Sequence, residues 1–79
     1  MKQRLINQHG QLRELLKNVR VSSGLTQADL ADRLKMPQSF VSKYESGERR
    51  LDVLELRAIC KAMGLSLAEF LRKLEKELA

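Results

Sequence analysis

Residues 25–50 decide the fold, and they read LTQADLADRLKMPQSFVSKYESGERR. Thr26 can cap a helix, because its side-chain oxygen can accept a free backbone N–H and an acid, Asp29, follows three positions later. Pro37 fits at or just before the first turn of a second helix, where a missing N–H costs little. The stretch therefore predicts two short helices joined by a tight turn, at about 26–35 and 38–46.

The same capping pattern occurs twice more, at Asp52 with Glu55 and at Ser66 with Glu69. An earlier helix is indicated by leucines and a valine at the i, i+3, i+4, i+7 spacing of one buried face. Together these signals predict an all-α, compact five-helix domain with helices at about 11–23, 26–35, 38–46, 53–63 and 67–78. We expect residues 1–10 to form a flexible N-terminal arm and residues 11–79 to form one domain.

The composition favours a partner that carries phosphates. The chain has 79 residues, 15 basic against 10 acidic, and a net charge of +5, and such an excess is typical of proteins that bind nucleic acid or an anionic surface. No apolar run approaches the roughly 20 residues of a membrane span. A single cysteine, Cys60, cannot form an internal disulfide. We therefore expect a cytoplasmic protein with no membrane partner.

The predicted helix at 38–46 carries hydrogen-bonding side chains on its outward face. Val41 faces back toward the preceding helix, where the small Ala31 allows a close approach. The outward positions hold Gln38, Ser39, Ser42 and Lys43, with no acid among them. Glutamine can pair with adenine, lysine can donate to guanine, and serine can do either. This face therefore suits the base edges of a DNA major groove.

Residues 25–50 closely resemble the Cro/repressor-type (XRE-type) helix-turn-helix family. The likeness covers about residues 11–70 and includes the TQ-x-x-LA opening and the S-x-x-E-x-G ending. It implies a lambda-repressor-like fold, with the helix-turn-helix proper at 26–46. It differs from the family's pattern at Lys35, where glycine is frequent, and at Pro37, where a serine or threonine cap is missing. Both differences concern the angle at which the second helix enters the groove.

The resemblance also implies roles for individual residues. The base-reading positions are Gln38, Ser39 and Lys43, with Ser42 as a weaker candidate, and the phosphate-binding positions are Gln27, Ser46, Arg49 and Arg50. Arg20 and Glu45 match a buried structural ion pair. Phe40 is left open by its position: it can touch a thymine methyl group or cover the edge of the core.

Other classes of site find little support in the sequence. His9 has no second ligand nearby, so no metal site is expected. The serines have no spaced histidine partner, and no glycine-rich phosphate loop occurs. We therefore expect neither an enzyme nor a cofactor, and no small-molecule ligand is evident.

The last predicted helix, 67–78, has more leucines than a small core needs. We expect Leu71, Leu74 and Leu78 to help form a two-fold dimer interface, and the alternative is that they fold back onto the domain. The sequence thus predicts a DNA-binding transcription regulator, acting as a homodimeric repressor on a palindromic operator. The rival hypothesis is a protein-interaction module, such as an antitoxin or an adaptor, that uses the same fold.

Overall fold

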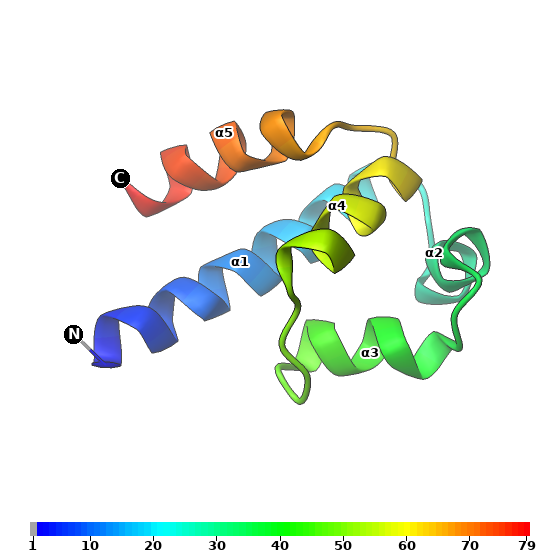
Figure 1. Ribbon diagram of the computed structural model, residues 1–79, viewed down its shortest axis with the longest axis horizontal. Helices are drawn as coiled ribbons and strands as arrows, with labels where there is room; N and C mark the ends of the chain where they lie inside the picture. Colours follow the sequence, from blue (N-terminus) through cyan, green and yellow to red (C-terminus); the bar gives the residue numbers. More distant parts are fainter. Residues whose placement is uncertain (1) are drawn as a thin grey trace.

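The computed structural model describes residues 2–79, which form five helices and no strand. The helices are α1 (Lys2–Ser22), α2 (Gln27–Leu34), α3 (Gln38–Ser46), α4 (Val53–Ala62) and α5 (Leu67–Leu78). In Figure 1, α1 and α5 run side by side in opposite directions, so that both ends of the chain lie at the same edge. The expected all-α, five-helix class is confirmed.

Three helices begin at the predicted caps. Thr26, Asp52 and Ser66 each accept a hydrogen bond from the backbone N–H three residues later, and the acid at that position bonds back to the cap. These reciprocal bonds satisfy two backbone donors that the first turn of a helix leaves free. The helix starts at 27, 53 and 67 are therefore fixed by local sequence.

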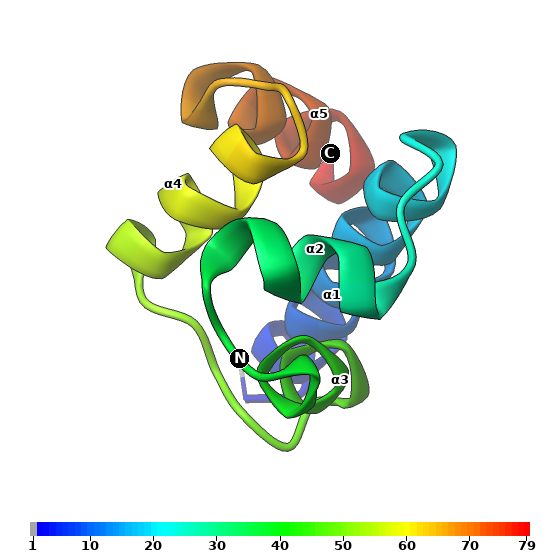
Figure 2. The same cartoon turned by 90° about the vertical axis from the view of Figure 1, so that its right-hand side faces the viewer.

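The core lies where α1, α2, α3, α4 and α5 converge. Its fully buried side chains come from every helix, and the largest are Tyr44, Phe70, Leu16, Leu30, Ile59, Val41 and Cys60. Burial raises the pKa of the Cys60 thiol to about 11. Helices α2 and α3 meet at a steep angle: α2 is seen nearly end-on in Figure 1, and α3 is seen nearly end-on in Figure 2.

In the turn between α2 and α3, Lys35 occupies the position where the family often has glycine. This residue takes a left-handed conformation with φ 58° and ψ 38°, and its backbone N–H bonds to the carbonyl oxygens of Ala31 and Asp32. Pro37 precedes α3 without a side-chain cap. Its own carbonyl accepts the N–H of Phe40 at 3.0 Å, so α3 starts at Gln38 as predicted.

The expected beginning of the first helix near Gln11 is wrong. α1 starts at Lys2 and continues through Gly10 to Ser22, so residues 2–10 are helical rather than an arm without structure. Met1, the first residue of that expected arm, lies outside the described residues.

Contacts with distant parts of the chain support the extra turns of α1. Gln11 Nε2 donates to the Glu77 carbonyl oxygen at 3.2 Å, and Leu5 and Leu12 line a hollow of about 180 Å³ together with Leu74 and Leu78. A helix gains most of its stability from tertiary packing of this kind rather than from propensity.

The three leucines expected at a dimer interface therefore differ in their exposure to solvent. Leu74 and Leu78 are half-buried and face the first turns of α1, so the intramolecular alternative accounts for much of their surface. Leu71 is 39% exposed. Leu74 and Leu78 are covered because α1 is longer than predicted and supplies apolar surface that a helix starting at Gln11 lacks.

Candidate nucleic-acid interface

Helix α3 has one face in the core and one face in solvent. Phe40, Val41 and Tyr44 are buried, whereas the sequence-predicted base-reading residues Gln38, Ser39 and Lys43 are exposed. Packing of the inner face fixes the position of the helix. The Cα atoms of the exposed residues are therefore fixed as well.

Ser42, the weaker candidate, lies differently from the other three. It is half-buried, and its Oγ donates to the Ser39 carbonyl oxygen at 3.2 Å. Bonding of a serine hydroxyl to its own helix is common and competes with other partners. The hydroxyl oxygen can still accept a hydrogen bond, which fits a minor contribution.

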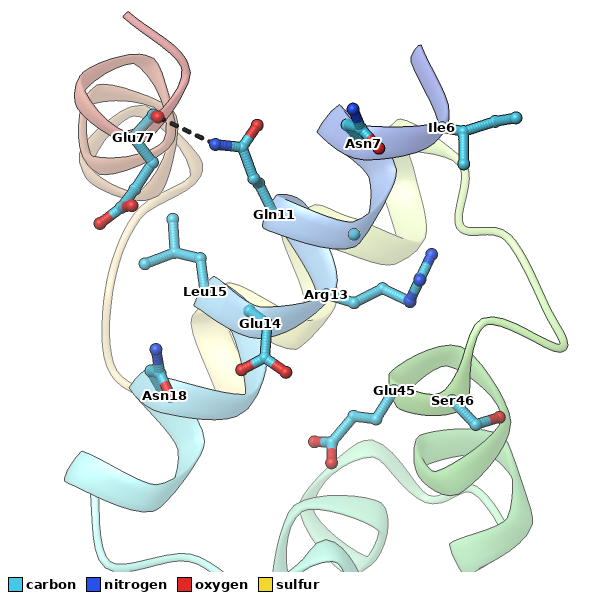
Figure 3. A pocket seen from close by; sticks show the side chains of 11 residues that line it. Ile6, Asn7, Gln11, Arg13, Glu14, Leu15, Asn18, Glu45, Ser46 and Glu77 are labelled. Carbon is cyan, nitrogen blue, oxygen red and sulfur yellow. Dashed lines mark hydrogen bonds between the residues drawn. The ribbon is translucent and has the colours of Figure 1, made fainter. Parts of the chain in front are cut away.

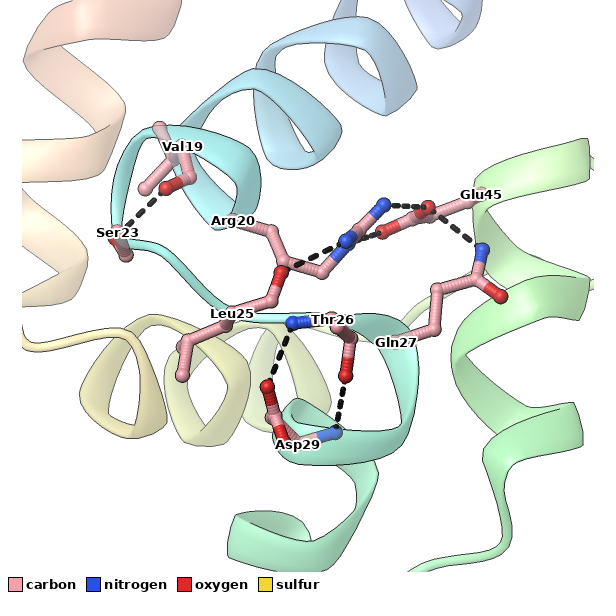
Figure 4. A network of polar contacts seen from close by, with 8 residues as sticks. All are labelled: Val19, Arg20, Ser23, Leu25, Thr26, Gln27, Asp29 and Glu45. Atoms are coloured by element: carbon pink, nitrogen blue, oxygen red, sulfur yellow. Dashed lines mark hydrogen bonds and ion pairs between the residues drawn. The ribbon is translucent and has the colours of Figure 1, made fainter.

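A polar network fixes α3 against α1 and α2 (Figure 4). The expected ion pair is present: Arg20 Nε lies 2.7 Å from Glu45 Oε2, and Arg20 Nη2 lies 3.1 Å from Glu45 Oε1. Arg20 Nη1 also donates to the Leu25 carbonyl oxygen at 2.9 Å. The hydrogen bond to Glu45 raises the pKa of the Arg20 guanidinium despite its burial. Two parallel N–H···O bonds fix the orientation as well as the distance of the two groups.

Gln27 is the third member of this network. Its Nε2 donates to Glu45 Oε1 at 3.0 Å, so one amide hydrogen of the predicted phosphate-binding side chain already has an acceptor. Gln27 lies in the first turn of α2, where backbone N–H groups remain free to bind an anion. The structure therefore places Gln27 beside a helix N-terminus and ties it to the end of α3.

Phe40 belongs to the core, which resolves the alternative left open by the sequence. It is only 8% exposed, and its ring meets the Tyr44 ring edge-on, with centroids 5.6 Å apart and an interplanar angle of 70°. The Arg49 guanidinium carbon lies 4.8 Å from the centre of the Phe40 ring. Such cation–π contact helps to fix the loop over the core.

Arg49 is also bound by an acid in α4. Its Nη2 lies 2.6 Å from Glu55 Oε2, and its Nη1 lies 3.0 Å from Glu55 Oε1. The hydrogen bond from Arg49, followed by the one from the Asp52 backbone, lowers the pKa of Glu55 to about 2. Glu55 therefore serves two purposes, as the capping acid of α4 and as the anchor of the loop that joins α3 to α4.

The rest of that loop, residues 47–52, is ordered by short-range bonds and by α1. Ser46 Oγ donates to the Lys43 carbonyl oxygen at 3.1 Å, and the Arg49 N–H donates to the same oxygen at 3.2 Å. Arg50 Nη1 lies 3.0 Å from His9 Nε2. The predicted phosphate-binding residues Ser46, Arg49 and Arg50 are all exposed; Ser46 is the last residue of α3, and the two arginines follow it in the loop.

The family follows from comparison with known proteins. A family model described as helix-turn-helix matches residues 16–70. An XRE-family-like protein from Pseudomonas syringae pv. tomato has a solved structure that is 43% identical, covering 96% of this chain and 93% of that chain, with a TM-score of 0.90. The chain belongs to the XRE-type helix-turn-helix family.

The chain is also similar in structure to the restriction-modification controller protein C.Esp1396I. Its wild-type structure is 28% identical and covers 90% of this chain and 91% of that chain, with a TM-score of 0.83. The same protein has been solved as a tetramer in complex with its natural 35 base-pair operator, at 28% identity, covering 90% of this chain and 93% of that chain, with a TM-score of 0.82. No curated protein sequence matches the chain. As an XRE-type protein, this chain is a DNA-binding transcription regulator and not an enzyme.

Sequence reasoning missed three residues near the XRE-type interface. His9 was considered only as a metal ligand, Glu55 only as a capping acid, and Arg13 not at all, yet the first two bind the loop arginines and the third lies against Gly47. The charge of Glu55, six residues after Arg49, was a usable signal. No local signal connects His9 with Arg50, because the two are 41 residues apart.

The structure also contains a broad hollow of about 610 Å³ between α1, the end of α3 and the end of α5 (Figure 3). Three acids, Glu14, Glu45 and Glu77, line it against one cation, Arg13, so the lining is negative on balance. Phosphates are repelled by such a lining, so the hollow is a poor candidate for contact with DNA. Within residues 2–79, no helix is long and apolar enough to cross a membrane, and no cluster of three potential metal ligands occurs.

Proposed function

We propose that the chain represses transcription as a homodimer on a palindromic operator, with α3 of each subunit in a major groove. The observation that carries this proposal is the two-sided character of α3. Its apolar side is locked into the core, and its exposed side offers Gln38, Ser39 and Lys43 without an acid. A polar helix of this kind fits between the two phosphate backbones and reaches the base edges.

In this arrangement the two ends of the helix-turn-helix bind phosphates. The first contact is made by the N-terminus of α2, with Gln27 beside it, and the second is made by Ser46, Arg49 and Arg50. Arg49 keeps N–H groups that are not used by Glu55 or by the Arg50 carbonyl oxygen. Such contacts set the register of the protein on the duplex, while Gln38, Ser39, Lys43 and, to a lesser degree, Ser42 choose the bases. We propose a cytoplasmic location, because the protein must reach the DNA that it regulates.

The dimer is proposed from the symmetry that operators of this kind require. Two recognition helices read two half-sites when they are about 34 Å apart, one turn of the duplex. The assembly of C.Esp1396I on its operator supports a multimeric form. We propose an interface on the outer face of α5 around Leu71, with the exposed edges of Leu74 and Leu78 beside it.

Selection of bound duplexes from a random DNA pool tests this function directly. We expect enrichment of a single sequence with two-fold symmetry, whose half-sites are separated by one helical turn. Enrichment of an asymmetric site would contradict the homodimer. If the pool is not enriched at all in dilute salt, while the chain recovers a stoichiometric protein partner, the protein-interaction hypothesis replaces this one.

A further inference from the structure

A small, partly open cavity separates the first half of α1 from the loop at residues 47–52. Its volume is about 90 Å³, well above the roughly 10–15 Å³ that a cavity needs in order to hold one water molecule. Apolar side chains of α1 and the loop form part of its wall. The other lining residues are His9, Arg13, Tyr44, Gly47, Arg49 and Arg50.

The lining is strongly cationic. Of the nine residues around the cavity, three are arginines, one is a histidine and none is acidic. Glu55 neutralises Arg49, but within residues 2–79 Arg13 forms no ion pair and no hydrogen bond, and Arg50 bonds only to a ring nitrogen of His9. Two guanidinium groups thus share a small space whose own lining holds no acid, although Arg13 also borders the hollow lined by Glu14 and Glu45.

The Arg13 guanidinium packs against the loop backbone at Gly47. A methyl group added at Gly47 would lie 3.1 Å from the Arg13 guanidinium carbon and 3.2 Å from its Nε, so the flat face of the guanidinium rests on the glycine. Figure 3 shows the Arg13 side chain extending from α1 toward the end of α3, on the side of Ser46. Gly47 itself has a φ of 89°, a conformation that favours glycine.

We propose that this cavity is an oxyanion site that takes the oxygens of a single phosphate group, held by Arg13 and Arg50. Guanidinium groups bind phosphate oxygens through paired N–H donors, and the volume admits one such group but not a nucleotide. The site opens beside the C-terminal end of α3, so a backbone phosphate of bound duplex DNA is one source, and this source rests on the proposed function. Free inorganic phosphate is the other source.

The first arm of the test measures the salt dependence of binding to the duplex recovered by selection. Arg13→Gln is compared with Arg57→Gln, which removes the same charge from α4, where Arg57 lines a hollow together with the turn to α5 and with none of the residues around the cavity. Each phosphate contact contributes about 0.9 to the slope of log K against log salt. We expect Arg13→Gln to lower the slope by about 1 and Arg57→Gln to leave it unchanged.

The second arm needs no DNA. Inorganic phosphate is titrated into the protein at constant ionic strength, and the NMR shifts of the Gly47 amide and of the arginine Nε–H groups are followed. A saturable shift in the wild-type protein that is lost in Arg13→Gln and kept in Arg57→Gln assigns the site to free phosphate. Arg50→Gln repeats the phosphate titration at the other guanidinium, in case Arg13→Gln fails to fold by circular dichroism. Its slope on DNA is not used, because the proposed function already expects that slope to fall.

The two arms separate the possible results. A lower slope without a saturable shift means that the site takes a DNA phosphate, and a shift with an unchanged slope means that it takes the free anion. If neither changes while the wild-type protein still binds its duplex, the oxyanion site is refuted and the proposed function stands. If the wild-type protein ignores duplex DNA, the proposed function fails, and the phosphate titration still decides the site.

Discussion

Lys35 holds the turn of the helix-turn-helix in a conformation that lysine rarely adopts. Its φ of 58° is the only positive value at a non-glycine residue in the described chain. The left-handed conformation costs a residue with a side chain about 1–2 kcal/mol. The sequence showed this departure from the family pattern, and the structure shows that the chain accepts the strain rather than changing the turn.

Replacing Lys35 with glycine relieves that strain. We expect Lys35→Gly to raise the free energy of unfolding by about 0.5–1 kcal/mol, because the gain in the folded state exceeds the added entropy of the unfolded chain. Urea denaturation measures the change. Lys73→Gly, at an exposed position inside α5, serves as the control and should lower stability by about 1 kcal/mol. A loss of stability in Lys35→Gly would contradict the assigned turn.

Glu55 makes the loop between α3 and α4 sensitive to acid. Its pKa falls from 4.5 to about 2 because Arg49 and the Asp52 backbone bond to the charged form. A lowered pKa in the folded state stabilises the protein fully above pH 4.5, and this stabilisation is lost as the pH falls toward 2. Glu55→Gln, which cannot ionise, should therefore be less stable than the wild type near neutral pH.

Acid denaturation followed by circular dichroism measures this difference. The gap in stability between wild type and Glu55→Gln should shrink below pH 4.5 and close near pH 2. Glu75→Gln, on the exposed surface of α5, provides the matched control. A gap that stays constant over this range would show that Glu55 acts through packing alone.

At the scale of the elements, α3 combines a fixed orientation with an exposed polar face. The Arg20–Glu45 pair and Gln27 tie its C-terminal end to α1 and α2, and Phe40 and Tyr44 anchor its inner side. The side chains that face solvent therefore carry the choice of sequence, whereas the loop that follows them carries contact with phosphates.

Substitutions on α3 and substitutions in the loop should have different effects on DNA binding. Gln38→Ala or Lys43→Ala should weaken binding to the selected operator by about 1–3 kcal/mol and relax the preference at one base position. Arg50→Ala should weaken all duplexes alike and flatten the salt dependence. Fluorescence anisotropy with matched and mismatched duplexes separates the two effects, and Lys17→Ala on the exposed surface of α1 is the control. If Gln38→Ala bound its operator as tightly as the parent, the groove assignment would be wrong.

The helices also show which features local sequence can predict. The starts of α2, α4 and α5 were predicted because each cap and its acid lie within one turn. The start of α1 was not, because Leu5, in the added turns, packs near Leu74 and Leu78, some seventy positions away. The same holds for the site: the outer face of α3 follows from helical spacing, but the contact of Arg50 with His9 does not.

For the whole molecule, the packing of α5 against α1 limits the surface left for a partner. Leu71 remains 39% exposed, while Leu74 and Leu78 turn toward α1. A two-fold interface on this face therefore centres on the middle of α5. The net charge of +5 adds a repulsion between subunits that bound DNA reduces.

Placing a charge at Leu71 tests the dimer. We expect Leu71→Asp to dissociate it, because an unpaired charge within an apolar interface is strongly unfavourable. Sedimentation equilibrium should then give the monomer mass of 9.1 kDa, with weaker binding to the full operator. Val21→Asp, at an exposed apolar residue near the end of α1, should leave the assembly unchanged. A wild-type protein that is already monomeric both in solution and on its operator would refute the interface.

The buried thiol of Cys60 has a practical consequence. With its side chain fully enclosed and its pKa raised to about 11, it supplies almost no thiolate to a maleimide reagent near neutral pH. A cysteine introduced on the surface would then react alone, without removal of the native one. Fluorescent dyes can therefore be attached at chosen points, and distances between labelled subunits can be followed as they assemble.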